Sequence, residues 1–181
     1  MISFETLKAY FDKNPERWRQ TVVGIFAPSP IVEINFALEQ LLANRTINSS
    51  EFFFDAGFGD GRILLLTARV HGIPSTGAEY DKELTELAEY HIKEIGKLDI
   101  AIGNILPIIL ARGDFGRNKT YSGAGIRFKD IATFYNYANN PHKIVEKMVR
   151  QSPRGTKFLY HGVHSPRDFK GLTLEQSIEY V

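Results

Sequence analysis

The sequence predicts a single α/β domain of the Rossmann-like type, with a mostly parallel, doubly wound sheet covered by helices on both faces. Three observations lead to this expectation. Short apolar runs alternate with helical patterns along most of the chain, as they do when crossover helices join parallel strands. A glycine-rich loop directly follows the first apolar run. The length of 181 residues suits one domain with one core.

The composition excludes several classes of protein. With 43% hydrophobic and 24% charged residues, the chain resembles a globular protein rather than a disordered one. It contains no cysteine, so disulfides, thiolate metal sites and a catalytic thiol are excluded, and a reducing compartment fits. The 22 basic and 21 acidic residues give no overall attraction to a polyanion. We therefore expect a cytoplasmic protein without a metal site, signal peptide or membrane span, and a nucleic-acid partner is not expected.

Residues 1–45 are expected to form an N-terminal helical segment that covers the functional site. Apolar residues in 4–11 share one face of a helix, which Asn14-Pro15 would end. The segment Pro28-Ser29-Pro30 predicts the start of a second helix, with Ser29 as its cap and Pro30 in the first helical position. That helix should extend to Ala43.

Residues 46–181 are expected to form the Rossmann-like core. The aromatic run from Glu51 to Phe58, bounded by polar residues and glycines, predicts a first, buried strand. We expect the following elements after it: a helix over 62–71 closed by Gly72, a strand over 75–80, a helix over 81–97, a strand over 108–111, an exposed loop over 116–127, a strand over 131–137, a helix over 141–150 and a strand over 157–161.

The loop Asp55-Ala-Gly57-Phe58-Gly59-Asp60-Gly61-Arg62 is the main candidate for a ligand site. It lies between a strand and a helix, where an open α/β sheet binds a nucleotide. It differs from the dinucleotide fingerprint G-x-G-x-x-G, because its third glycine comes one residue early and an acid precedes its first glycine. The carboxylates do not suit a pyrophosphate, but they complement a ligand with an ammonium and a sulfonium group. This favours S-adenosylmethionine. Glu79, at the end of the second strand, can accept hydrogen bonds from both ribose hydroxyls.

The segments FFFDAGFGDGR and GAEYD resemble the glycine-rich and ribose motifs of the class I S-adenosylmethionine-dependent methyltransferases. The resemblance implies that the backbone of Gly57 to Gly61 holds the methionine end of the cofactor, that Glu79 holds the ribose and that Tyr80 lies against the adenine. Asp114 and Phe115 would contact the adenine edge. The further candidate cofactor contacts are Ser29, Asp55, Phe58, Asp60 and Arg62.

Within that class the chain is most similar to the small protein-lysine methyltransferases, both the ATP synthase c-subunit type and the histone-methylating type without a SET domain. Phe26-Ala-Pro28-Ser29-Pro30 resembles their Tyr-x-Pro-Thr-Pro segment, which closes over the cofactor. Phe134-Tyr135-Asn136 resembles their asparagine motif at the methyl-transfer end. The resemblance implies transfer of a methyl group to an amine, with Asn136, Tyr135 and Tyr137 as catalytic candidates. Tyr137-Ala138 replaces the Asn-Phe of the histone type, and only a short tail follows the last strand.

Three functions remain open at this point. The chain is a protein-lysine methyltransferase, a methyltransferase acting on RNA or a small molecule, or a non-catalytic protein that binds the cofactor. Other motifs are given structural interpretations: His161 and His164 are strand-end histidines rather than a metal pair, Arg17-Trp18-Arg19 is a surface helix end, and Arg112-Gly-Asp114 is a chance match to an adhesion motif. Tyr135 and Tyr137, which are catalytic candidates, have a second interpretation as residues of the hydrophobic core.

Overall fold

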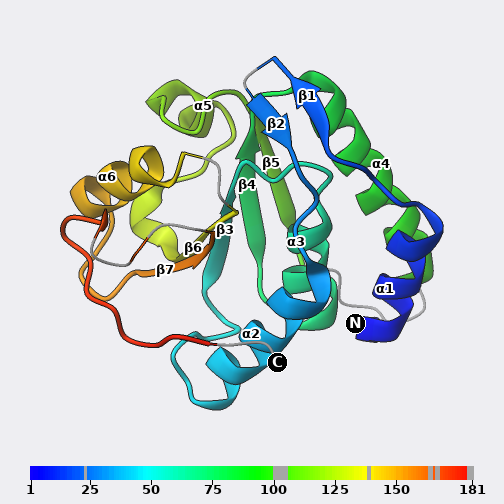
Figure 1. Ribbon diagram of the computed structural model, residues 1–181, viewed down its shortest axis with the longest axis horizontal. Helices are drawn as coiled ribbons and strands as arrows, with labels where there is room; N and C mark the ends of the chain where they lie inside the picture. Colours follow the sequence, from blue (N-terminus) through cyan, green and yellow to red (C-terminus); the bar gives the residue numbers. More distant parts are fainter. Residues whose placement is uncertain (23, 100–105, 138–139, 163–164, 166–167, 179–181) are drawn as a thin grey trace.

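The computed structural model describes all residues except 23, 100–105, 138–139, 163–164, 166–167 and 179–181. Five strands form one sheet in the order β5-β4-β3-β6-β7 (Figure 1), and every neighbouring pair is parallel. The strands are β3 (Phe52–Ala56), β4 (Ser75–Glu79), β5 (Ile108–Arg112), β6 (Ile131–Tyr137) and β7 (Lys157–His161). All five lie within a residue or two of the expected positions.

The order of the strands makes the sheet doubly wound, which confirms the expected fold class. The first strand of this sheet along the chain is the central strand β3. The next two strands, β4 and β5, lie outward on one side of it, and the chain then returns to the other side of β3 to form β6 and β7. β3 and β6 are therefore neighbours whose onward connections leave in opposite directions. Open α/β sheets bind ligands at such a switch point, outside the carboxyl ends of the strands.

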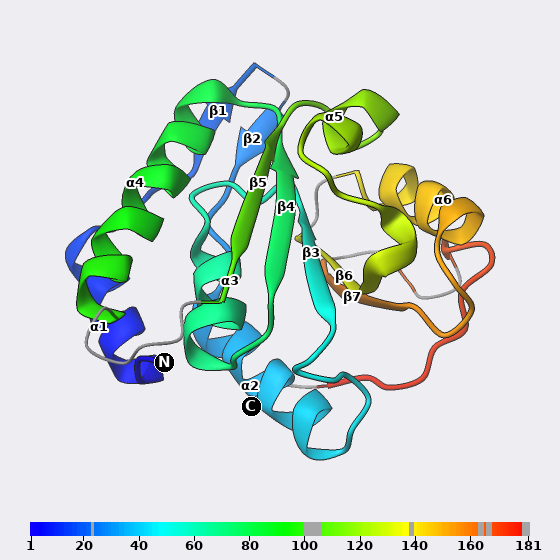
Figure 2. The ribbon, with the colours of Figure 1, turned by 180° about the vertical axis from the view of Figure 1, so that it is seen from behind.

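The helices form two layers, one on each face of the sheet (Figures 1 and 2). One layer contains α1 (Phe4–Lys13), α2 (Ile31–Ala43), α3 (Arg62–Leu65) and α4 (Lys82–Asp99). The other contains α5 (Asn118–Gly123), the 3-10 turn η3 (Phe128–Asp130) and α6 (Pro141–Gln151). The protein is thus a three-layer α/β/α structure.

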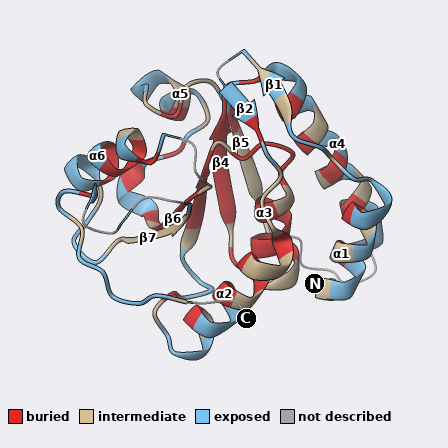
Figure 3. Ribbon diagram, viewed as in Figure 1, coloured by how far each residue is buried: buried red, intermediate tan, exposed pale blue. Residues whose placement is uncertain are grey.

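Successive side chains of β3 point to opposite faces of the sheet and so contribute to two separate cores, one under each helix layer. Phe53 packs with Leu38 in the core under α1 and α2, whereas Phe54 packs with Phe128 and Phe134 in the core under α5 and α6. Both strand residues have no exposed surface, and burying a phenylalanine contributes about 1.5–3 kcal/mol. The neighbouring strand β4 is likewise buried along its length (Figure 3). A strand with consecutive aromatic residues is therefore stable here because both of its faces are covered.

The N-terminal segment contains a hairpin that the sequence did not predict. β1 (Arg19–Thr21) pairs with β2 (Gly24–Phe26), so the expected helix end at residues 17–19 is wrong. Trp18 lies before β1 and is 72% exposed. Strands of three residues are too short to show an alternating pattern in the sequence.

The start of α2 also differs from the prediction. The helix begins at Ile31 with Pro30 as its N-cap, and no side chain in the described structure caps it. The Ser29 hydroxyl instead accepts a hydrogen bond from the Tyr135 hydroxyl at 3.2 Å. The expectation of a Ser29 cap is therefore wrong because the hydroxyl has a partner on β6.

The segment 116–127 is not the exposed loop that its glycines predicted. It contains α5, and Tyr121 on this helix is 3% exposed in the core under α6. One aromatic residue anchors the short helix, and the glycines flank it.

The helix after the glycine loop is interrupted by a π-helical turn, η1 (Leu66–Val70). The hydroxyl of Thr67 lies 2.8 Å from the Ile63 carbonyl oxygen and 2.6 Å from the Ser75 hydroxyl, fully buried. A hydroxyl inserted into the helical hydrogen bonds is a recognised cause of such distortions. The predicted helix over 62–71 is therefore present, but only its first four residues are α-helical.

The chain after β7 crosses the edge of the sheet without adding a strand in the part that is described. It is held by an ion pair between Lys157 and Glu175 at 2.6 Å and by a hydrogen bond from Asn44 to Gln176 at 2.8 Å. A cavity of about 690 Å³ lies between α2, β7 and this segment. Within the described residues, no helix is long and apolar enough to span a membrane.

Two glycines provide a test of the packing. A Cβ at Gly77 on β4 would lie 2.7 Å from the Asp55 carbonyl oxygen and 2.9 Å from the Phe58 ring. We expect Gly77→Ala to lower the free energy of unfolding by about 1–3 kcal/mol. The control is Gly96→Ala in α4, where a Cβ meets no atom within 4 Å. It should raise stability by about 0.5–1 kcal/mol. Urea denaturation measures both, and equal effects would contradict the packing described.

Candidate functional site

The glycine-rich loop lies at the carboxyl end of β3, as predicted. Gly57, Gly59 and Gly61 have φ angles of 87°, 55° and 80°, in the left-handed region that favours glycine. The loop leads directly into α3 at Arg62. The glycines are therefore required for the turn itself.

Glu79 connects this loop to the end of β4. One carboxylate oxygen accepts a hydrogen bond from the Gly59 N–H at 3.0 Å, and the other accepts one from the Asp81 N–H at 2.9 Å. Burial raises the pKa of Glu79, although the backbone hydrogen bonds oppose the rise. Tyr80 follows it and is 50% exposed. The acid expected to hold the ribose is thus next to the glycine loop.

Asp55 is the second carboxylate of the site. It is the fourth residue of β3 and is 3% exposed. Burial raises its pKa well above its usual range, and the nearby Glu79 and Asp60 raise it further. Within the described structure, no lysine or arginine forms an ion pair with Asp55 or Glu79. The end of the sheet therefore concentrates buried acid groups that are not neutralised.

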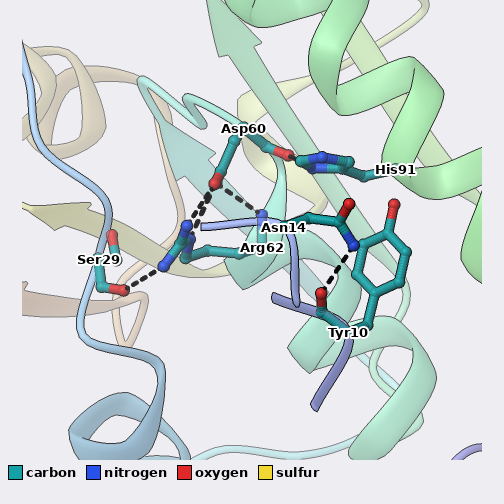
Figure 4. Close-up of polar contacts among 6 residues, drawn as sticks. All are labelled: Tyr10, Asn14, Ser29, Asp60, Arg62 and His91. Carbon is teal, nitrogen blue, oxygen red and sulfur yellow. Dashed lines mark hydrogen bonds and ion pairs between the residues drawn. The ribbon is translucent and has the colours of Figure 1, made fainter. Parts of the chain in front are cut away.

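Asp60 has a different environment, because Arg62 binds it. The two side chains form an ion pair at 2.6 Å (Figure 4). The same guanidinium lies 3.5 Å from the Ser29 carbonyl oxygen and 4.8 Å from the centre of the Phe11 ring. The charge of Asp60 is therefore balanced by Arg62, and its contact with the cofactor stays a prediction. Arg62 also links the loop to the N-terminal segment.

Other side chains of the loop region pack against the protein. A Cβ at Gly59 would overlap with the ring of Phe26, and one at Gly61 would lie 2.9 Å from the Ala88 Cβ. Phe58 is buried in a small cluster with Leu64 and Ala88. Its ring belongs to the core, and its carbonyl oxygen accepts a hydrogen bond from the Gly61 N–H at 2.9 Å. Phe26, at the end of β2, covers the glycine loop.

Asp114 and Phe115 follow β5. The Asp114 carboxylate lies 2.7 Å from the Lys143 ammonium and accepts the Gly116 N–H at 2.7 Å. Burial alone would raise the pKa of Asp114, but these two interactions outweigh it and lower the pKa. Phe115 is buried, with the Lys143 ammonium 5.7 Å from its ring centre. Asp114 therefore already has a cationic partner at the place where it was expected to meet adenine.

The three catalytic candidates at the end of β6 do not share one face of the sheet. Tyr135 is 1% exposed and packs in the α1–α2 core, and Tyr137 lies beside that core. Asn136 lies between them and is fully buried, and its amide donates a hydrogen bond to the Ala56 carbonyl at 2.9 Å. Asn136 therefore joins the ends of β3 and β6 at the switch point.

Glu33 and His161 were not among the predicted site residues. The Nε2 atom of His161 lies 3.3 Å from a carboxylate oxygen of Glu33, and its ring is 5.2 Å from that of Tyr137. His161 ends β7, which agrees with its interpretation as a strand-end histidine, and His164 lies outside the described residues. No spacing in the sequence links Glu33 to His161, because their proximity depends on α2 lying beside β7.

The central strand, the glycine loop after it and the acid ending the next strand together define a Rossmann-like α/β fold, the fold of S-adenosylmethionine-dependent methyltransferases. One solved structure with this fold is the RNA methyltransferase from Salinibacter ruber in complex with S-adenosyl-L-homocysteine, with a TM-score of 0.60, 21% identity and coverage of 86% of each chain. A mutant of MtNAS in complex with S-adenosylmethionine has a TM-score of 0.55 and 15% identity, over 77% of this chain and 52% of that one. The glycopeptide N-methyltransferase MtfA, complexed with S-adenosyl-L-methionine, has a TM-score of 0.50 and 16% identity, over 71% and 53%. No protein-family model and no curated protein matches the sequence. The likeness is therefore one of fold.

The link through Arg62 can be tested by its removal. Arg62→Ala leaves the buried Asp60 carboxylate without its partner, which should cost about 3–5 kcal/mol of unfolding free energy. The control is Arg150→Ala, which breaks an ion pair with Glu146 whose side chains are 73% and 64% exposed and should cost less than about 1 kcal/mol. Asp60→Asn combined with Arg62→Ala should recover part of the loss. Similar losses for Arg62→Ala and Arg150→Ala would show that the buried pair has no special role.

Proposed function

We propose that this protein is an S-adenosylmethionine-dependent methyltransferase that transfers a methyl group to an amine. The observation that carries the proposal is the pair of buried carboxylates, Asp55 and Glu79, on either side of a glycine loop. The likeness in fold to solved methyltransferases agrees with it.

The residues present fit this cofactor. It carries an ammonium and a sulfonium group, and its ribose has two neighbouring hydroxyls. Burial and repulsion from Glu79 and Asp60 disfavour ionisation of the Asp55 carboxyl group. A cation placed beside this group lowers the free-energy cost of ionising it. Glu79 accepts one backbone hydrogen bond on each carboxylate oxygen and keeps further lone pairs for the hydroxyls. A pyrophosphate would be repelled by the same two groups.

The chemistry requires little acid or base catalysis. The cofactor, when bound, supplies a methyl group that is already activated on sulfur, so the protein contributes chiefly proximity and orientation. Burial raises the pKa of Tyr135, so its hydroxyl stays protonated and donates to Ser29. Asn136 is best described as a positioning residue, because its amide holds the end of β3 in place. Tyr137, beside His161, forms a wall where an acceptor can approach.

A protein lysine is our first candidate for the acceptor. It is supported by the resemblance of two segments, residues 26–30 and 134–136, to the small protein-lysine methyltransferases. These segments are distant in the sequence, and the hydrogen bond between Tyr135 and Ser29 joins them in space. The exposed carboxylate of Glu33 beside His161 and Tyr137 would also suit a cationic amine.

An RNA acceptor is the second candidate, and two observations favour it. One is the named activity of the Salinibacter ruber protein, which this chain matches over 86% of both lengths. The other is a basic groove on the α5–α6 side of the sheet. Transfer of tritiated methyl from S-adenosylmethionine into a protein extract or into total RNA distinguishes the candidates. A protein that binds the cofactor but labels neither these macromolecules nor the small molecules of the extract would be a non-catalytic binder.

Cofactor binding depends on Glu79 if the proposal is correct. We expect Glu79→Gln to weaken binding of S-adenosylmethionine and S-adenosylhomocysteine at least about tenfold, the effect of one or two lost charge-assisted hydrogen bonds. The control is Glu89→Gln, an exposed residue of α4, which should bind like the wild type. Calorimetric titration with both compounds and with NAD provides the measurement. Binding of NAD alone, or of none of the three, would refute the assignment.

Replacing Asp55 with asparagine should have opposite effects on stability and on cofactor binding at pH 8. The raised pKa of Asp55 means that the folded chain holds this proton more tightly than the unfolded chain. Its contribution to stability is therefore complete below the unfolded pKa of about 3.9 and is lost as the pH rises through the folded pKa. We expect Asp55→Asn to raise the urea midpoint at pH 8, to leave it nearly unchanged at pH 4, and to weaken binding of S-adenosylmethionine at pH 8. A lower midpoint at pH 8 would mean that the carboxylate is stabilised in the free protein.

A further inference from the structure

The charges of this protein are strongly separated along the chain, although they nearly cancel overall. Residues 112–157 contain ten lysines and arginines and three acidic residues, whereas the rest of the chain contains twelve basic and eighteen acidic residues. The segment 112–157 forms α5, η3, β6 and α6. Since α5 and α6 lie on the same face of the sheet in both views (Figures 1 and 2), that face is basic while the chain as a whole is near neutral.

A groove of about 620 Å³ lies between α5 and α6 on this face. We call it the basic groove. Its single acidic lining residue is Glu146, whose carboxylate lies 2.6 Å from the Arg150 guanidinium. The residues that line it are Gly116, Arg117, Asn118, Lys119, Lys143, Glu146, Lys147, Arg150 and Gln151.

Two cations at the base of this groove are fixed in position. Lys147 is 8% exposed, its ammonium contacts the Asn118 side-chain oxygen, and it lies 4.8 Å from the centre of the Tyr121 ring. Lys143 is held by Asp114 at 2.7 Å. The side chains of Arg117, Lys119 and Arg150 are exposed around them. A groove with fixed central cations and exposed outer ones suits an extended polyanion.

The basic groove begins beside the candidate cofactor site. Its inner end is formed by Gly116 and Lys143, both bound to Asp114. Asp114 follows β5 at the carboxyl end of the sheet, where the neighbouring Gly113 N–H donates to the Glu79 carbonyl at 2.8 Å. A chain lying in the groove would therefore pass the edge of the sheet that carries Glu79.

From these observations we infer that the basic groove binds the phosphate backbone of a nucleic acid and directs the strand to the cofactor site. The arrangement favours a strand over a membrane, because the cations line a groove rather than a flat face. Binding itself does not depend on methyl transfer, whereas the role of the strand as acceptor rests on the proposed methyltransferase function.

Fluorescence anisotropy with a labelled 20-nucleotide single strand, made once as RNA and once as DNA, tests the inference. Each neutralised phosphate of a single strand contributes about −0.7 to the slope of log K against log salt. We expect the combined variant Arg117→Ala, Lys119→Ala, Arg150→Ala to lose at least about tenfold in affinity and to reduce the slope by about 2. Binding of either strand with this response supports the inference.

The matched control is Lys13→Ala, Lys82→Ala, Lys93→Ala, which removes the same charge from exposed residues outside the groove and should bind like the wild type. Equal loss in both triple variants, no binding of either strand, or binding only to phosphatidylserine vesicles would overturn the inference. Calorimetry of the groove variant with S-adenosylmethionine keeps the two proposals apart. If the groove variant binds the cofactor normally but has lost strand binding, the substitutions affect the groove alone. If the wild type does not bind the cofactor, the proposed function fails, and the inference about the groove is judged by strand binding.

Discussion

The hydrogen bonds accepted by Glu79 determine the geometry of the whole carboxyl end of the sheet. One carboxylate oxygen fixes the glycine loop through Gly59, and the other fixes the start of α4 through Asp81. The group is buried and its pKa is raised, so these contacts are made at an electrostatic cost. Together with Asp55, whose ionisation is disfavoured by burial and by the nearby acids, it places two buried acid groups side by side without a basic partner among the described residues. Such a pair is costly in the free protein and becomes favourable when a cation is bound.

The glycine loop is also fixed from the opposite side. Arg62 binds Asp60 and reaches the Ser29 carbonyl oxygen and the ring of Phe11, while Phe26 covers Gly59. The N-terminal segment is therefore not an independent addition to the sheet. Any movement that uncovers the loop must separate contacts made by α1, by β2 and by the residue before Pro30. Access to the loop and the position of the first 30 residues are thus coupled.

The parts of the fold that were predictable are those whose signal is local. The aromatic run of β3, the helical spacing of α4 and the glycines before Arg62 each indicate their structure within a few residues, and the structure agrees with them. The errors concern contacts between distant residues. Ser29 was expected to cap a helix but binds Tyr135 on β6, and Tyr121 anchors a helix where glycines indicated a loop. Asp60 and Asp114 illustrate the same limit for the candidate site, since their charges alone could not reveal Arg62 and Lys143 as partners.

The sheet is not equally well packed at its two edges. The flank of β7 faces a cavity of about 690 Å³. The segment that crosses it is held by the buried ring of Phe169, which packs against Phe158 and Tyr160 of β7; beyond Phe169 it is held by a partly exposed ion pair and one exposed hydrogen bond. Partly exposed ion pairs contribute little to stability. Local opening of the part beyond Phe169 therefore requires less free energy than global unfolding. The protein thus combines a glycine loop that is held from two sides with a β7 edge whose covering segment has few contacts beyond Phe169.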